Sequence, residues 1–172
     1  IHIMIILTGN PGIGVSNHAI VHALNELKAA VGDRVILTAG KMHAAGVISE
    51  GGENILTGND VDAFIDAGAD ILLLPAPGTV PGITMEYAHK LIARAHAKGA
   101  LAMTTIGTSQ EGADEATIRE IALMCKMAGA DIHHIGDSGY MGMAIPDNLT
   151  AYSIAIRGKR HTYRRMAMSL LR

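Results

Sequence analysis

The stretch from Asp131 to Gly142 concentrates residues that could carry out chemistry. It holds two adjacent histidines, a carboxylate and a glycine-rich turn, namely His133, His134, Asp137, Gly136, Ser138 and Gly139. Imidazole and carboxylate groups act as general acids and bases, or bind a divalent metal ion. Neighbours on a strand point to opposite faces, so only one of the two histidines can enter a site. The other is expected to be a hydrogen-bonded core histidine.

Lys41 and His43 form a second candidate group, just after another expected strand. A lysine there can form a Schiff base if desolvation lowers its pKa, or can neutralise a phosphate or carboxylate. The competing interpretation is a salt bridge at the rim of the fold. The candidate catalytic set is Lys41, His43, His133, His134 and Asp137.

A divalent metal ion is a further option at this site. His43, one of the paired histidines and Asp137 would suit zinc or a similar ion. The chain has no short ligand motif such as His-Glu-x-x-His. The cofactor is therefore left open, and no metal ligand is assigned.

Two loops rich in glycine and hydroxyl groups predict an anion site. Gly107, Thr108 and Ser109 follow the fourth expected strand, and a second set follows the fifth: Gly136, Ser138 and Gly139. The loops after the last two strands of a (β/α) barrel commonly bind phosphate, because glycines let backbone N–H groups approach an anion. Asn10, after the first strand, is a further substrate-binding candidate. The alternative is that these hydroxyls only cap helices.

The elements that position these residues follow from a repeated junction. Glycines that end helices before the chain re-enters the sheet recur about every 30 residues, at Gly32, Gly68, Gly99 and Gly129. The expected strands are Ile3–Thr8, Val35–Ala39, Ile71–Leu74, Leu101–Ile106 and Ile132–Gly136. The expected helices are Asn17–Ala30, Asp60–Ala67, Thr84–Ala97, Glu115–Ala128, Asn148–Ile156 and His161–Leu171, with Asp60 and Thr84 as N-caps.

Strict alternation of strands and helices predicts a parallel α/β sheet. A doubly wound sheet needs elaborate loops only at its switch point, whereas a barrel gathers all of them around one mouth. Here every expected strand is followed by a long polar loop, and the opposite turns are short. We therefore predict a partial TIM-type barrel of about five βα units, equivalent to strands four to eight. Residues 1–172 would form one such domain or its C-terminal part.

Several loop motifs are similar to those of an uncharacterised bacterial TIM-barrel family. They are Gly9–Gly12, Ala39–His43, Pro75–Gly82, Ile106–Gly112 and Ile156–His161. Members are often labelled phosphoenolpyruvate phosphonomutase-like or haloacid dehalogenase-like hydrolases. The resemblance covers essentially the whole chain and implies a longer parent barrel. It implies no established reaction, so no catalytic residue follows from it.

Composition narrows the classes of function. Apolar residues make up 49% of the chain and charged residues 17%, yet no apolar run approaches the roughly 18 residues of a membrane span. A net charge of −2 gives no reason to expect nucleic acid. The single cysteine, Cys125, and the lack of a signal peptide favour the cytoplasm.

The combined prediction is an enzyme acting on a small phosphorylated or carboxylated metabolite, of lyase, mutase or hydrolase type. The alternative is a non-catalytic ligand-binding or structural half-barrel. Five strands would leave sheet edges and inner apolar residues uncovered. We therefore expect either a homo-oligomer or a missing N-terminal barrel segment to cover them.

Overall fold

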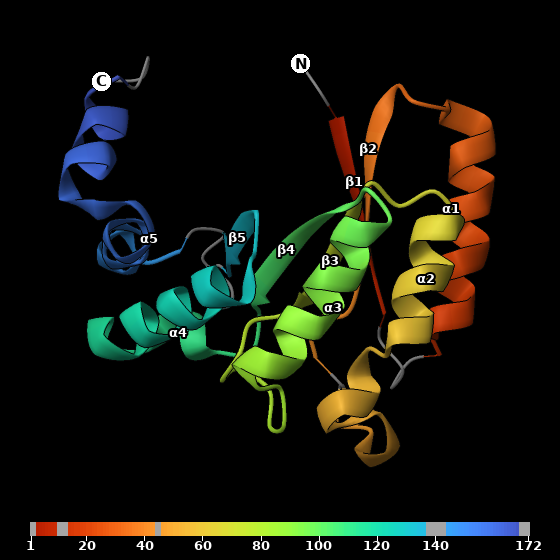
Figure 1. Ribbon diagram of the computed structural model, residues 1–172, viewed down its shortest axis with the longest axis horizontal. Helices are drawn as coiled ribbons and strands as arrows, with labels where there is room; N and C mark the ends of the chain where they lie inside the picture. The colour runs from red at the N-terminus through yellow and green to blue at the C-terminus, as the bar shows by residue number, and fades with distance from the viewer. Residues whose placement is uncertain (1–2, 10–13, 44–45, 137–143, 169–172) are drawn as a thin grey trace.

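The computed structural model describes residues 3–9, 14–43, 46–136 and 144–168 (Figure 1). Five parallel strands lie side by side in the order in which they occur along the chain. They are β1 (Ile3–Thr8), β2 (Val35–Gly40), β3 (Ile71–Pro75), β4 (Leu101–Ile106) and β5 (Ile132–Ile135). Each strand therefore pairs with the next one in sequence, with Ile3 opposite Val35 and Ile71 opposite Leu101.

Helices connect the strands and cover one face of the sheet. They are α1 (Asn17–Val31), α2 (Gly58–Asp66), α3 (Met85–Ala97), α4 (Glu115–Ala128) and α5 (Pro146–Ala167), with short 3-10 turns η2 (Ile48–Glu50), η3 (Gly52–Ile55) and η4 (Gln110–Gly112). Crossovers between parallel strands are right-handed, so consecutive strand order places successive helices on the same face. The helices α1 to α4 follow one another around the outside of the curved sheet (Figure 1). The predicted five-unit half-barrel is confirmed.

Aspartates at two of the repeated junctions fasten one strand to its neighbour. Asp70 precedes β3 and accepts the N–H of Leu37 in β2 at 2.8 Å. Asp131 precedes β5 and accepts the N–H of Ala102 in β4 at the same distance. The N–H groups of both aspartates in turn donate to the carbonyls of these partners. The repeat thus supplies both a glycine that ends the helix and a carboxylate that sets the register of the next strand.

The two faces of the sheet are packed differently. On the outer face, Leu37 and Ala39 of β2 are fully buried in a core shared with the helices. On the inner face, Leu73 and Met103 are buried in a smaller apolar cluster. At the β1 edge of the arc, Met4 and Ile6 are each 43% exposed.

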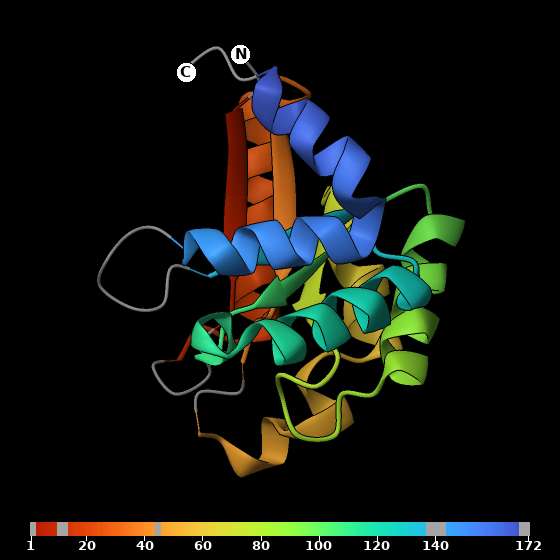
Figure 2. The ribbon, with the colours of Figure 1, turned by 90° about the vertical axis from the view of Figure 1, so that its left-hand side faces the viewer.

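Two helix boundaries differ from expectation. Thr57, not Asp60, is the N-cap of α2, and Asp60 completes a capping box by accepting the Thr57 N–H at 2.7 Å. The last two expected helices form one element, α5, which is broken at Gly158 where the backbone is not helical (φ 79°, ψ 161°). The second half of α5 turns away at this point (Figure 2).

A search of the helices in the described ranges finds none with the length and apolar content needed to cross a bilayer.

We expect Asp131→Ala to lower the free energy of unfolding by about 1–2 kcal/mol, because the buried Ala102 N–H loses its acceptor. Burial acts to raise the pKa of Asp131, but hydrogen bonds from His96 and from Ala102 bring it below its usual value. A carboxyl with a lowered pKa contributes stability above its unfolded pKa and loses it as pH falls. The difference between wild type and variant should therefore shrink below about pH 4.

Urea denaturation at pH 7 and pH 3.5 measures both effects. Asp33→Ala is the matched control, because the Asp33 side chain is 95% exposed. Equal destabilisation by the two variants would contradict the assigned role of Asp131.

Candidate functional site

Two cavities open at the edge of the sheet where the strands end. The first, which we call the Glu111 cavity, has a volume of about 460 Å³. Its lining residues come from the loops after β2, β4 and β5 and from β5 itself: Met42, Gly107, Glu111, His134, Ile135, Gly136 and Ala144. Of these two cavities, it is the one that combines a carboxylate with an imidazole.

Glu111 and His134 both line this cavity. Glu111 is 7% exposed, which is unusual for a carboxylate. Its Oε2 atom and the Nδ1 atom of His134 are buried, and neither has a hydrogen-bond partner within the described part of the chain. A buried polar atom without a partner costs about 1–3 kcal/mol. Such atoms are kept where a ligand supplies the missing contact.

The position of Glu111 is set by the elements around it. Asn148, in the first turn of α5 and 3% exposed, donates from Nδ2 to the carbonyls of Glu111 at 2.8 Å and Ala113 at 2.9 Å. Ser109 precedes η4 with a φ of 76°, a conformation that costs a non-glycine residue about 1 kcal/mol or more. A Cβ at Gly136 would lie 2.9 Å from the Ile106 carbonyl oxygen, so the close approach to the backbone of β4 requires glycine there, and the Glu111 Cδ atom would be in ordinary contact at 3.4 Å.

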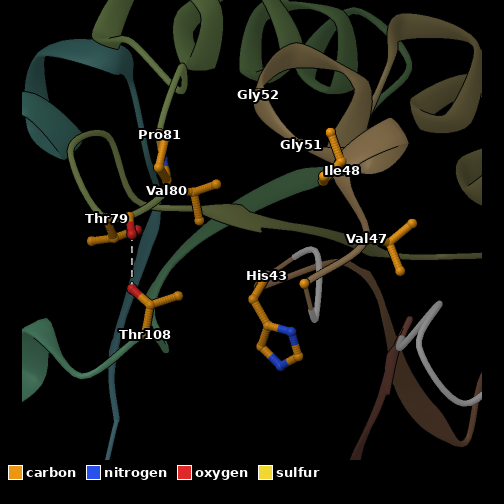
Figure 3. A pocket seen from close by; sticks show the side chains of 10 residues that line it. His43, Val47, Ile48, Gly51, Gly52, Thr79, Val80, Pro81 and Thr108 are labelled. Carbon is orange, nitrogen blue, oxygen red and sulfur yellow. Dashed lines mark hydrogen bonds between the residues drawn. The ribbon is translucent and has the colours of Figure 1, made fainter.

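The second cavity is lined mainly by apolar side chains and measures about 470 Å³. We call it the apolar cavity, and Figure 3 shows its lining: His43, Gly46, Val47, Ile48, Gly51, Gly52, Thr79, Val80, Pro81 and Thr108. The Thr108 hydroxyl lies 2.9 Å from the Thr79 carbonyl oxygen and also contacts the Gln110 Oε1 atom, and the Thr79 hydroxyl donates to the Ala76 carbonyl at 2.7 Å. Neither hydroxyl proton is left for a ligand.

Lys41 lines neither cavity. It is 1% exposed and lies against Gly9 on the helix side of the sheet, where the Ile20 side chain of α1 also approaches Gly9. Met42, the next residue, takes the inner side instead and packs on the inner apolar cluster. The physical reason is the alternation of side chains, which continues past the end of β2.

The paired histidines separate as expected. His134 lines the Glu111 cavity. His133 lies under α5, where its Nδ1 atom is 3.2 Å from the Tyr152 hydroxyl and the two rings meet edge to face. Burial raises the pKa of Tyr152, so the phenol keeps its proton. His133 is therefore a half-buried, hydrogen-bonded histidine, and it lines a separate cavity beneath α5.

The predicted catalytic residues do not meet in one cavity. Lys41 lies on the outer side, His43 lines the apolar cavity and His134 lines the Glu111 cavity. Asp137, Asn10, Ser138 and Gly139 lie outside the described residues. Within the described ranges no three histidine, cysteine, aspartate or glutamate side chains are grouped as metal ligands.

The anion site predicted between the loops after β4 and β5 contains a carboxylate. Gly107 and Gly136 do line one cavity, but Glu111 of the Gly107 loop lines it too. Thr108 faces the apolar cavity, and Ser109 is exposed. A carboxylate at this site disfavours a phosphate unless it is protonated or bridged. Anion binding here stays a prediction.

Sequence reasoning missed Glu111, although a signal was present. Glu111 lies in the loop after β4, and polar residues in such loops are candidates in a barrel. Lys41 is a candidate for the same reason, since it also follows a strand.

The sequence matches the model of one protein family along nearly its whole length. That family is described as "Domain of unknown function (DUF7916)", and the match covers residues 2–172. A comparison with curated proteins finds no match.

Solved aldolase structures share the fold. Deoxyribose phosphate aldolase from Aeropyrum pernix, described as tetrameric, has a TM-score of 0.58 at 12% identity and covers 91% of this chain and 70% of its own. The aldolase QR15 gives 0.60 at 12% identity, with 92% and 76% covered. The YdjI aldolase from Escherichia coli K12 gives 0.55 at 12% identity, with 89% and 53% covered. At this identity the likeness shows the fold alone. None of these three is a phosphonomutase or a dehalogenase.

We expect His133 to make stability depend on pH between about 5 and 7. Burial lowers the pKa of His133, and the charge of Arg157 lowers it further, while Asp131 acts in the opposite direction. The unfolded chain therefore binds a proton near pH 6.5 that the folded chain does not, so stability falls as pH falls through this range.

His133→Gln should weaken this dependence, measured as the urea midpoint at several pH values. His161→Gln, at an exposed position, tests whether loss of any histidine does the same. Equal effects of the two variants would overturn the assignment.

Proposed function

Because the chain belongs to the family described as "Domain of unknown function (DUF7916)" and shares the fold of aldolases, we propose that it is a lyase that cleaves a carbon–carbon bond beside a carbonyl group. One observation carries the proposal. Glu111 and His134 place a buried carboxylate and an imidazole, each with an unpartnered atom, in one cavity at the carboxyl ends of the strands. In this fold, that end carries the active sites.

The proposed steps use Glu111 as the base and His134 as a hydrogen-bond donor. Glu111 takes the proton from a hydroxyl on the carbon β to the carbonyl, and the O–H electron pair forms a new C=O bond. The carbon–carbon bond breaks, and its electron pair moves into an enolate. His134 donates to the enolate oxygen. Glu111 then returns the proton to the α-carbon, so no oxidant or reductant is needed.

The proposal assigns no step to Lys41, because its side chain lies against Gly9 and lines neither cavity. The substrate remains a small carboxylated or phosphorylated compound. Its anionic group must lie away from the Glu111 carboxylate, since like charges in one cavity repel.

A second candidate is a non-catalytic ligand-binding half-barrel. Lys41, His43 and His134 lie in three separate places rather than in one cavity, which supports this alternative. A binding protein needs a cavity but no acid–base pair, and the apolar cavity alone would serve it.

We also propose that protein covers the β1 edge. Met4 and Ile6 are exposed on its inner face. Exposed apolar side chains beside an open strand edge are typical of association surfaces. A second copy of the chain is one such cover, and the Aeropyrum pernix enzyme is an example of an aldolase described as an oligomer.

We expect the protein to catalyse exchange of α-protons for deuterium in D₂O, because an enolate forms in the reverse direction as well. Pyruvate tests a carboxylated donor and dihydroxyacetone phosphate a phosphorylated one, with proton NMR as the readout. Glu111→Gln should reduce the exchange rate by about 100-fold or more, the usual contribution of a general base.

Glu115→Gln is the matched control, because Glu115 lies on the exposed surface of α4 and pairs with Arg119. Thermal unfolding of each variant shows whether the fold is kept. Exchange that persists at the wild-type rate in the Glu111→Gln, His134→Gln double variant would exclude the proposed mechanism.

A further inference from the structure

The Glu111 cavity and the apolar cavity share a wall made from two pairs of consecutive residues. Met42 lines the first cavity and His43 the second, just after β2. Just after β4, Gly107 likewise lines the first cavity and Thr108 the second. A Cβ at Gly107 would lie 3.2 Å from the Met42 Sδ atom, so the contact of Met42 with Gly107 is part of the partition. Met42 is a flexible thioether, which adapts its shape to what it contacts.

The apolar cavity is built by close backbone contact rather than left by chance between loops. Gly82 lies against Gly52, since a Cβ on Gly82 would be 2.9 Å from the Gly52 Cα atom. The Tyr87 hydroxyl is 2.9 Å from the Glu53 carbonyl and 3.0 Å from that of Leu56. These contacts hold the η2 and η3 segment, with Ile48, to the elements around β3.

Ile48 is the most unusual residue of the lining. Its exposed fraction is 95%, although its side chain is apolar and it stands at the mouth of a cavity (Figure 3). The hydroxyl protons of Thr79 and Thr108 are taken up by hydrogen bonds within the chain. His43 is the single ionisable residue among those that line the cavity, and it lies across from these threonines (Figure 3). The surface offered to a ligand is therefore mainly hydrocarbon.

We infer that the apolar cavity holds the unbranched aliphatic chain of the substrate while the carbonyl end lies in the Glu111 cavity, and that the flexible Met42 side chain turns away from Gly107 to let one molecule reach both. This inference rests on the proposed function for the position of the reacting end. A two- or three-carbon compound covers little of this apolar lining, whereas a chain of several carbons can bury much more of it from water. The substrate class is thus a 2-oxo compound with a chain of several carbons, in place of the smallest metabolites.

Straight-chain 2-oxo acids from pyruvate to 2-oxodecanoate test the inference. Calorimetry measures the affinity of each acid, and NMR in D₂O measures exchange at its C3 protons. Burying each added methylene should tighten binding by about fourfold until the cavity is full. Ile48→Asp should flatten this dependence on chain length. Met127→Asp, at a 61% exposed position on α4, should leave it unchanged.

The outcomes separate the two proposals. Binding that strengthens with chain length without any exchange would keep the chain site and overturn the lyase. Exchange on pyruvate with no gain from longer chains would keep the lyase and overturn the chain site. Equal flattening by Ile48→Asp and Met127→Asp would also overturn the chain site, because the cavity would then not be where the chain binds.

Discussion

The hydrogen-bonded pairing of each strand with the next strand in the chain is the constraint from which the rest of the structure follows. Since every crossover has the same hand, this order puts the helices on one face and all the strand-to-helix loops at one end. The inner face is left without a helix layer, and its apolar residues pack on one another across the curve. Both cavities exist because the loops after β2, β3, β4 and β5 meet at that end.

The sequence predicted the strands, the parallel sheet and the half-barrel, because periodicity and junction glycines are local signals. It also predicted that the paired histidines would separate. It did not predict where Lys41 points, because one residue of register decides between the two faces of a sheet. Nor did it reveal Glu111, whose burial depends on Asn148 of α5, 37 residues away along the chain. The single-domain and cytoplasmic predictions stay predictions.

The Glu111 cavity is costly to the fold. Each unpartnered polar atom there reduces stability by about 1–3 kcal/mol, against a total of about 5–15 kcal/mol for a typical domain. The strained backbone at Ser109 adds to this. Asn148 offsets part of it by satisfying two carbonyls at once. Unfavourable terms gathered around two side chains, with contacts that hold them in place, are typical of a preorganised site.

The aspartates that fasten β3 and β5 also bear on how the chain folds. Each of these hydrogen bonds joins a strand to the preceding βα unit, and its two residues are about 30 positions apart in the sequence. Paired residues of neighbouring strands have similar sequence separations. For a parallel sheet this is a low contact order, so little loop-closure entropy is lost at each step. Assembly can therefore advance in the direction of synthesis, with every completed unit serving as the template for the one that follows.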